Sequence, residues 1–88
     1  MNIPDLMRER LADLAPQHLD IVDDSARHKG HAGATQGGHY RLTIVSASFT
    51  GKSTLARHRL VHQVLGDLMH NGIHALSIIA ATPGEFQS

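Results

Sequence analysis

The sequence predicts a single α+β domain in which helices pack on one face of a small β-sheet. Apolar residues recur at helical spacing in two segments, and they alternate with polar residues in three shorter segments. In chain order these segments read αββαβ. A strand–helix–strand unit has a right-handed crossover, so we expect the third strand to lie parallel to the second. The predicted architecture is a two-layer sandwich with a three-stranded mixed sheet.

The composition supports one domain and excludes several classes of protein. The 88 residues suffice for one hydrophobic core. The sequence contains no cysteine, so the chain alone forms neither a disulfide nor a thiolate metal site. No apolar run approaches the roughly 18 residues of a membrane span, and the N-terminus lacks a signal-peptide pattern. We therefore expect one cytoplasmic domain over residues 1–88, without membrane contact.

The first 23 residues predict a helix and a strand. Pro4 suits a first helical turn, because its missing N–H would have no partner there. Pro16 ends the helical pattern. The apolar positions of this helix are Leu6, Met7, Leu11 and Leu14. Residues 18–23 then alternate as a short strand with Leu19 and Ile21 on one face.

The middle of the chain predicts a loop and a second strand. Residues 25–38 are rich in glycine and histidine, which indicates a flexible loop. Its length is unusual in so small a domain and therefore indicates a function. Residues 40–46 alternate as a strand. We expect Tyr40, Leu42 and Ile44 to point inward, and Arg41, Thr43 and Val45 outward.

The second helical pattern contains a conflict. One apolar stripe comprises Leu60, Val61, Val64, Leu65 and Leu68. Projected backward at about 100° per residue, the stripe includes Arg57 and leaves out Leu55. We therefore predict a break near Arg57, with residues 52–56 as a separate short helical turn, and an end at Asn71-Gly72.

The C-terminal segment predicts a third strand and a final turn. Residues 74–82 alternate, with Leu76, Ile78 and Ala80 on one face. Residues 83–86 form the turn, and we expect Phe86 to fold back onto the core.

Charged residues are segregated along the chain although the net charge is zero. Residues 1–24 carry six acidic and two basic side chains, whereas residues 25–59 carry six basic side chains and no acidic one. A cationic region of this kind attracts phosphate groups or an acidic partner. The neutral total disfavours tight nonspecific binding to nucleic acid.

The spacing of polar residues argues against an enzyme. Gly51-Lys52-Ser53-Thr54 resembles the end of a Walker A loop, but Ser46 stands where that motif requires its first glycine. No Ser-His-Asp or paired-carboxylate arrangement follows from the spacing. We therefore expect neither nucleotide hydrolysis nor another catalytic activity.

Five segments, in this order and spacing, resemble the BolA proteins over nearly the whole chain. They are Lys29-Gly30-His31-Ala32-Gly33, Phe49-x-Gly51-Lys52-Ser53, Arg57-His58-Arg59-Leu60-Val61, Ile73-His74-Ala75-Leu76-Ser77 and Thr82-Pro83. The resemblance implies a class II KH-like fold, which agrees with the αββαβ order. It also implies a monothiol glutaredoxin partner that shares a bridging [2Fe–2S] cluster. Some bacterial members of the family are DNA-binding transcriptional regulators.

The same resemblance implies a set of cluster ligands. In BolA-like proteins the recurring ligand is a histidine at the start of the third strand, which is His74 here. His31, in the Gly-His-Ala-Gly stretch, is the expected second ligand, and His39 is its alternative. Imidazole is a known ligand of iron–sulfur iron. Because the chain has no cysteine, the remaining ligands would be thiolates of the glutaredoxin and of glutathione, and the isolated chain would hold no cofactor.

Zinc is the alternative metal for the histidine-rich loop. His28, His31 and His39 offer three imidazoles. Their spacing is irregular, and the sequence shows no partner to orient the rings. We therefore favour the shared cluster.

A cationic segment is the candidate nucleic-acid site. It comprises Lys52, Arg57, His58 and Arg59. Lysine and arginine contacts to phosphate give affinity without much sequence choice. The same segment also suits a solvated surface or a docking face for an acidic partner. We expect a monomer, with a weak homodimer through exposed strand residues such as Val45 and Ile79 as a further possibility.

Overall fold

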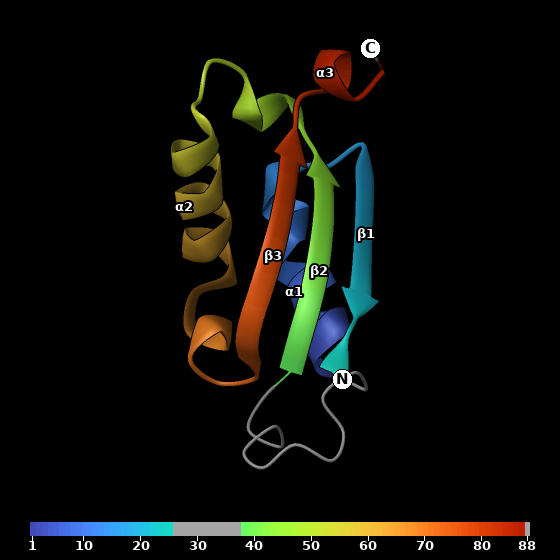
Figure 1. The fold of residues 1–88 in the computed structure, drawn as a ribbon, viewed down its shortest axis with the longest axis vertical. Helices are drawn as coiled ribbons and strands as arrows, with labels where there is room; N and C mark the ends of the chain where they lie inside the picture. The colour runs from blue at the N-terminus through green and yellow to red at the C-terminus, as the bar shows by residue number, and fades with distance from the viewer. Residues whose placement is uncertain (26–37, 88) are drawn as a thin grey trace.

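The computed structural model describes residues 1–25 and 38–87 and confirms the α+β class (Figure 1). Its helices and strands are α1 (Ile3–Leu11), β1 (His18–Asp23), β2 (Gly38–Val45), α2 (Thr54–Leu65), β3 (Ile73–Ala81) and α3 (Pro83–Gln87). Short 3-10 turns lie at Ala12–Leu14, Ala47–Phe49 and Gly66–Met69. The loop predicted at about 25–38 falls, except for its two end residues, outside the described part of the chain. Within the described residues, no helix has the length and hydropathy needed to cross a membrane.

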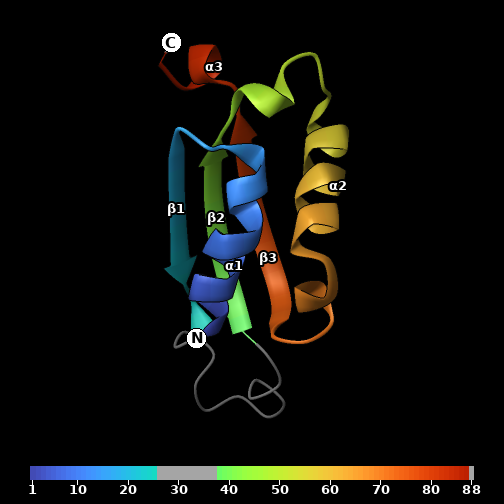
Figure 2. The same cartoon turned by 180° about the vertical axis from the view of Figure 1, so that it is seen from behind.

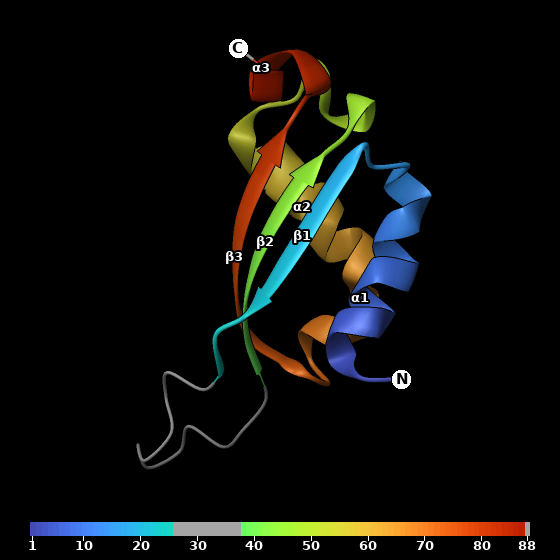
Figure 3. The ribbon, with the colours of Figure 1, turned by 90° about the vertical axis from the view of Figure 1, so that its right-hand side faces the viewer.

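The sheet is mixed, as predicted, with the strand order β1-β2-β3. β1 runs antiparallel to β2, and β3 runs parallel to β2. A bulge between Gly38 and His39 shifts the register at the start of β2. Helices α1 and α2 cover one face of the sheet, as Figure 2 shows from behind, and no described helix or strand covers the other, open face (Figure 3).

The core lies between the sheet and these two helices. Its residues that are at most 1% exposed are Met7, Leu11, Leu42, Ile44, Phe49, Val61 and Leu65. The predicted inward residues of β2 are all buried. Val45, which was predicted to point outward, is only 2% exposed. It lies opposite Ala81, at the end of the sheet where α3 follows, so it cannot serve a homodimer; Ile79 is 62% exposed.

The predicted break near Arg57 is wrong, because α2 is continuous from Thr54 to Leu65. Ser53 caps the helix by accepting a hydrogen bond from the Ala56 N–H at 3.1 Å. Arg57 does face inward, but its Nη1 donates to the Ala80 carbonyl at 3.1 Å. A satisfied guanidinium is tolerated on the inward face, which is why the apolar stripe alone misplaced the helix start. α2 also ends at Leu65, before the predicted Asn71-Gly72 turn.

The C-terminal turn is a short helix, and Phe86 does not reach the core. Phe86 is 50% exposed and stacks on His18, with ring centroids 5.1 Å apart. Thr82 and Glu85 form a capping box at the start of α3. The Thr82 N–H donates to Glu85 Oε1 at 2.8 Å, and the Glu85 N–H donates to Thr82 Oγ1 at 3.3 Å. These bonds hold α3 at the end of β3, away from the core.

Candidate functional site

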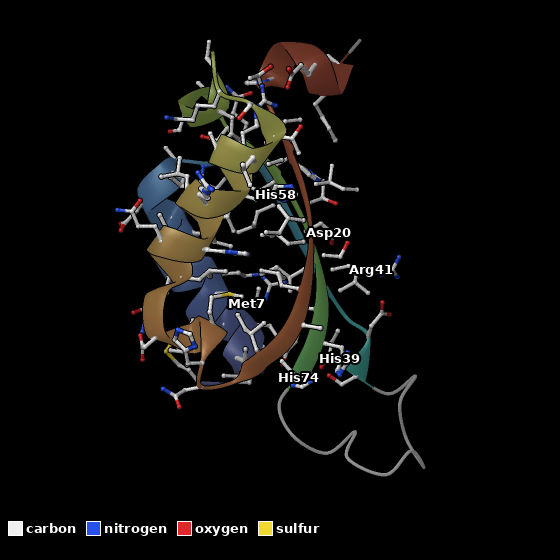
Figure 4. All side chains as sticks on the ribbon, turned by 60° about the vertical axis from the view of Figure 1, so that its left-hand side comes forward. Met7, Asp20, His39, Arg41, His58 and His74 are labelled. Atoms are coloured by element: carbon white, nitrogen blue, oxygen red, sulfur yellow. The ribbon has the colours of Figure 1, made fainter. Side chains whose placement is uncertain are left out.

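Two imidazole rings meet at the end of the sheet where β2 and β3 begin. His39 is the second residue of β2, and His74 is the second residue of β3. Their ring centroids lie 5.1 Å apart, with an angle of 42° between the planes. Figure 4 shows the two residues side by side on neighbouring strands. His74 is exposed and His39 is half-buried, so both rings are accessible to solvent at this end of the sheet.

The β-bulge explains why these rings come together. Gly38 pairs with Ile73, but His39 pairs with Ala75, so His74 is the extra residue between the two pairs. A bulge of this kind re-aims a side chain. It places His74 beside His39 although the two are not register partners.

Two glycines shape this end of the sheet. The Gly38 N–H donates to the Gly72 carbonyl at 2.9 Å, which joins the starts of β2 and β3. Gly72 has a φ of 130°, where side chains are rarely found, and a Cβ there would collide with the Ile3 side chain. A Cβ at Gly38 would collide with the Tyr40 ring. The histidine pair therefore depends on small residues next to it.

The backbone of His39 is held by the end of β1. The His39 N–H donates to Ser25 Oγ at 3.0 Å, and its carbonyl accepts from the Asp24 N–H at 2.7 Å. The Ser25 N–H donates in turn to Asp23 Oδ1 at 2.8 Å. Hydrogen bonds from Ser25 hold the pKa of Asp23 below its usual value of 3.8. The ring of His39 thus projects from a fixed backbone.

A shallow depression adjoins the pair on the open face of the sheet. Its volume is about 340 Å³, and it is lined by Asp24, His39, Tyr40, Arg41, Ala75, Leu76 and Ser77. Arg41 Nε lies 2.7 Å from Asp24 Oδ2. Burial raises the pKa of Tyr40 above its usual value of 10.0, with a smaller contribution from the Asp23 charge. The depression therefore combines an ion pair with one of the two imidazoles.

The donor set fits a shared cluster better than a complete metal site. Among residues 1–25 and 38–87, no group of three or more His, Cys, Asp or Glu side chains is placed to hold a metal ion. His39 and His74 supply two nitrogen donors, and the chain supplies no sulfur. His28 and His31 lie outside the described residues, so the zinc alternative and His31 as second ligand stay predictions. An iron–sulfur cluster held by two imidazoles takes its other two ligands from thiolates, so these rings would fill half of its ligand positions.

In the cationic segment, Arg57 is bound within the protein, whereas the other basic side chains lie at the surface. The Arg57 side chain is 13% exposed, and its guanidinium donates to the Glu85 carboxylate at 2.6 and 3.1 Å. Hydrogen bonds from Arg57, and then from the Thr82 backbone, lower the pKa of Glu85 to about 2. Lys52 and Arg59 are exposed, and His58 is half-buried. The structure therefore leaves Lys52, His58 and Arg59 on the surface and assigns Arg57 to holding α3.

The roles of three charged residues near these sites, Asp24, Arg41 and Glu85, were not identified from the sequence. The Thr82–Glu85 capping box has a readable signal, since a threonine followed three residues later by glutamate marks a helix start. The Asp24–Arg41 pair has no such signal. It depends on the register of β1 against β2, which the sequence does not fix across a long loop.

Comparisons with known proteins identify the family of the chain. The family model for BolA-like proteins matches residues 11–85. The chain is 45% identical, over 90% of its length, to SufE-like protein 1, chloroplastic/mitochondrial, from Arabidopsis thaliana, but it spans only 23% of that protein. It is 42% identical, over 93% of its length, to Protein BOLA1, chloroplastic, from the same species, and spans 54% of it. The chain thus covers about half or less of these two relatives.

A bacterial relative and a solved structure match over more of their lengths. The DNA-binding transcriptional regulator BolA of Vibrio cholerae is 38% identical over 97% of this chain and 79% of its own. The solved structure of BolA1 from Arabidopsis thaliana has a TM-score of 0.84 and 40% identity, and the match covers 97% of this chain and 96% of that one. The chain belongs to the BolA family.

Proposed function

We propose that this protein pairs with a monothiol glutaredoxin and supplies two imidazole ligands to a bridging [2Fe–2S] cluster. Its role would be non-enzymatic, in iron–sulfur trafficking or in redox or iron regulation. The observation that supports this proposal is the pairing of the His39 and His74 rings, whose centroids lie 5.1 Å apart at an accessible end of the sheet. A chain without cysteine needs a second molecule to complete such a ligand set.

The residues of this chain would bind the cluster and orient it, and they would catalyse no reaction. His74 is exposed and would present its ring nitrogen to the partner. His39 would present its ring from a backbone held by Ser25 and Asp24. When bound, the cluster supplies a one-electron redox centre and a transferable iron–sulfur unit, at a potential that imidazole ligands raise. Thiolates of the glutaredoxin and of glutathione would complete the set, and His31 is the alternative second ligand.

The experiment is a titration of the cysteine-free chain with cluster-loaded monothiol glutaredoxin, followed by visible absorption and circular dichroism. We expect a new spectrum and a complex on gel filtration. His74→Ala should remove the spectral change, and His62→Ala, an exposed histidine on α2, should leave it intact. His39→Ala and His31→Ala identify the second ligand. An unchanged spectrum and the absence of a complex with the unmodified chain would reject the proposal.

A second function, DNA-binding regulation, is favoured by one observation. Lys52 and Arg59 are exposed and make no ion pair within the described residues, and His58 lies beside them at the start of α2. The Vibrio cholerae relative carries a DNA-binding regulator's name. We expect Lys52→Glu to weaken DNA binding and to reduce its salt dependence, because one phosphate contact is lost. Arg8→Glu on α1 is the matched control and should leave DNA binding unchanged. If the unmodified chain does not bind a promoter-length duplex at low salt, this function is rejected.

The location in the cytoplasm and the monomeric state also belong to this proposal. A cysteine-free chain fits a reducing compartment. Two relatives have "chloroplastic" in their names, which describes those proteins. Cell fractionation tests the location, and sedimentation of Ile79→Lys against the unmodified chain tests the weak homodimer.

A further inference from the structure

Arg41 stands out among the cations near the histidine pair because it is fixed at one end and open at the other. Asp24 Oδ2 holds its Nε at 2.7 Å, and the side chain remains 55% exposed. Within the described residues, neither terminal amino group of Arg41 makes a hydrogen bond or ion pair that would occupy it. Figure 4 shows the side chain extending from the open face of the sheet, on the same side as His39.

The two register partners of Arg41 on the sheet are uncharged. Its register partner on β1 is Val22, and its partner on β3 is Ser77. Asp24 is thus the one carboxylate that pairs with it among the described residues. A guanidinium with a fixed Nε and two open amino groups is a preorganised fork for a carboxylate.

We propose that Arg41 binds a carboxylate of the glutathione that completes the shared cluster. This inference rests on the proposed function. Arg41 lies two residues from His39 along β2, a rise of about 7 Å. The two carboxyl carbons of glutathione are separated from its sulfur by about six and eight bonds, which spans such a distance. The depression that holds Arg41 and His39 has a volume of about 340 Å³, within the range of small-molecule sites. Arg41 would therefore select the thiol that enters beside the histidine pair.

The first experiment measures how much glutathione the complex needs. The chain, the monothiol glutaredoxin, iron and sulfide are combined at increasing glutathione, and visible circular dichroism reports the half-maximal concentration. We expect Arg41→Gln to raise that concentration about tenfold, as the loss of one charge-assisted hydrogen bond implies. Arg41→Lys keeps the charge without the fork and should fall between the two. Arg8→Gln removes an exposed cation on α1 and should change nothing.

Two results of this experiment would overturn the inference. One is an unchanged glutathione requirement in Arg41→Gln. The other is a loss of complex formation in Arg41→Gln that added glutaredoxin restores and added glutathione does not. That result would mean that Arg41 binds a carboxylate of the partner protein.

A second experiment needs no cluster and separates this inference from the proposed function. The ¹⁵N-labelled chain alone is titrated with glutathione, and the Arg41 Nε–H and Ser77 N–H resonances are followed. We expect both to shift, and we expect no shift with glutathione whose two carboxylates are esterified. Absence of a shift, or equal shifts with the diester, would overturn the inference. If the unmodified chain forms no cluster complex but these shifts occur, the proposed function fails and the carboxylate site stands.

Discussion

Replacing Gly72 with alanine should destabilise the fold and disturb the histidine pair. Gly72 has a φ of 130°, and its carbonyl accepts the Gly38 N–H bond that joins β2 to β3. An alanine there would be strained, and its Cβ would collide with the side chain of Ile3. Because His74 lies two residues further on, any relaxation of the turn would move its ring.

The magnitude follows from two costs and one gain. Backbone strain at such a φ costs about 1–3 kcal/mol. Crowding in a packed region costs about 1–3 kcal/mol, and we take about 1 kcal/mol because the end of the Ile3 side chain can rotate. Reduced freedom of the unfolded chain returns about 0.5 kcal/mol. The expected net loss is about 1.5–3.5 kcal/mol, and each kcal/mol lowers the Tm of a domain of this size by about 4–8 °C.

Two other glycines separate the causes. Gly51 has a φ of 78° but no atom within 4 Å of an added Cβ, so Gly51→Ala reports strain without crowding. Gly84 has no such φ and no close neighbour, so Gly84→Ala reports only the effect on the unfolded chain. Urea and thermal unfolding by circular dichroism should rank the losses as Gly72, then Gly51, then Gly84. Equal stabilities for Gly72→Ala and Gly84→Ala would refute the conformation described for this turn.

Two further predictions concern the Arg57–Glu85 contact, which holds α3, and the buried side chain of Ser46. The carboxyl of Glu85 has its pKa lowered from 4.5 to about 2. Its contribution to stability is therefore full above pH 4.5 and lost as the pH falls toward 2. The stability gap between the unmodified chain and Glu85→Gln should close over that range, and a gap independent of pH would contradict it. Ser46 is 1% exposed, and its Oγ donates to the Leu14 carbonyl at 2.5 Å and accepts from the Ser48 N–H at 3.0 Å. Ser46→Ala should cost about 1–3 kcal/mol in urea unfolding, and Ser48→Ala, at an exposed position with a 3.4 Å contact, should cost clearly less.

Much of the fold could be predicted because its periodicity is clean. Leu42 and Ile44 are buried as the alternation of β2 indicates, and β3 runs parallel to β2 as the crossover rule requires. The prediction failed at Arg57, where a charged residue lies on an apolar stripe. Its partners, Ala80 and Glu85, are more than twenty residues away in the chain, so no local pattern could show that its charge is satisfied.

The candidate site could be predicted only in part. The resemblance to the BolA proteins identified His74 from the segment around it. The contact with His39 depends on a bulge of one residue at Gly38, which the alternation pattern does not reveal. The open fork of Arg41 depends on the pairing of β1 with β2, and that register also lies beyond local sequence patterns.

The central claim, that imidazoles of this chain bind the cluster, is tested most directly by pulsed electron paramagnetic resonance. The chain is labelled with ¹⁵N-histidine, combined with unlabelled cluster-loaded glutaredoxin, and reduced. We expect hyperfine coupling to two ¹⁵N-imidazoles in the unmodified chain, and none in His74→Ala, which should not form the complex. A reduced cluster in the complex that shows no ¹⁵N coupling would contradict the account.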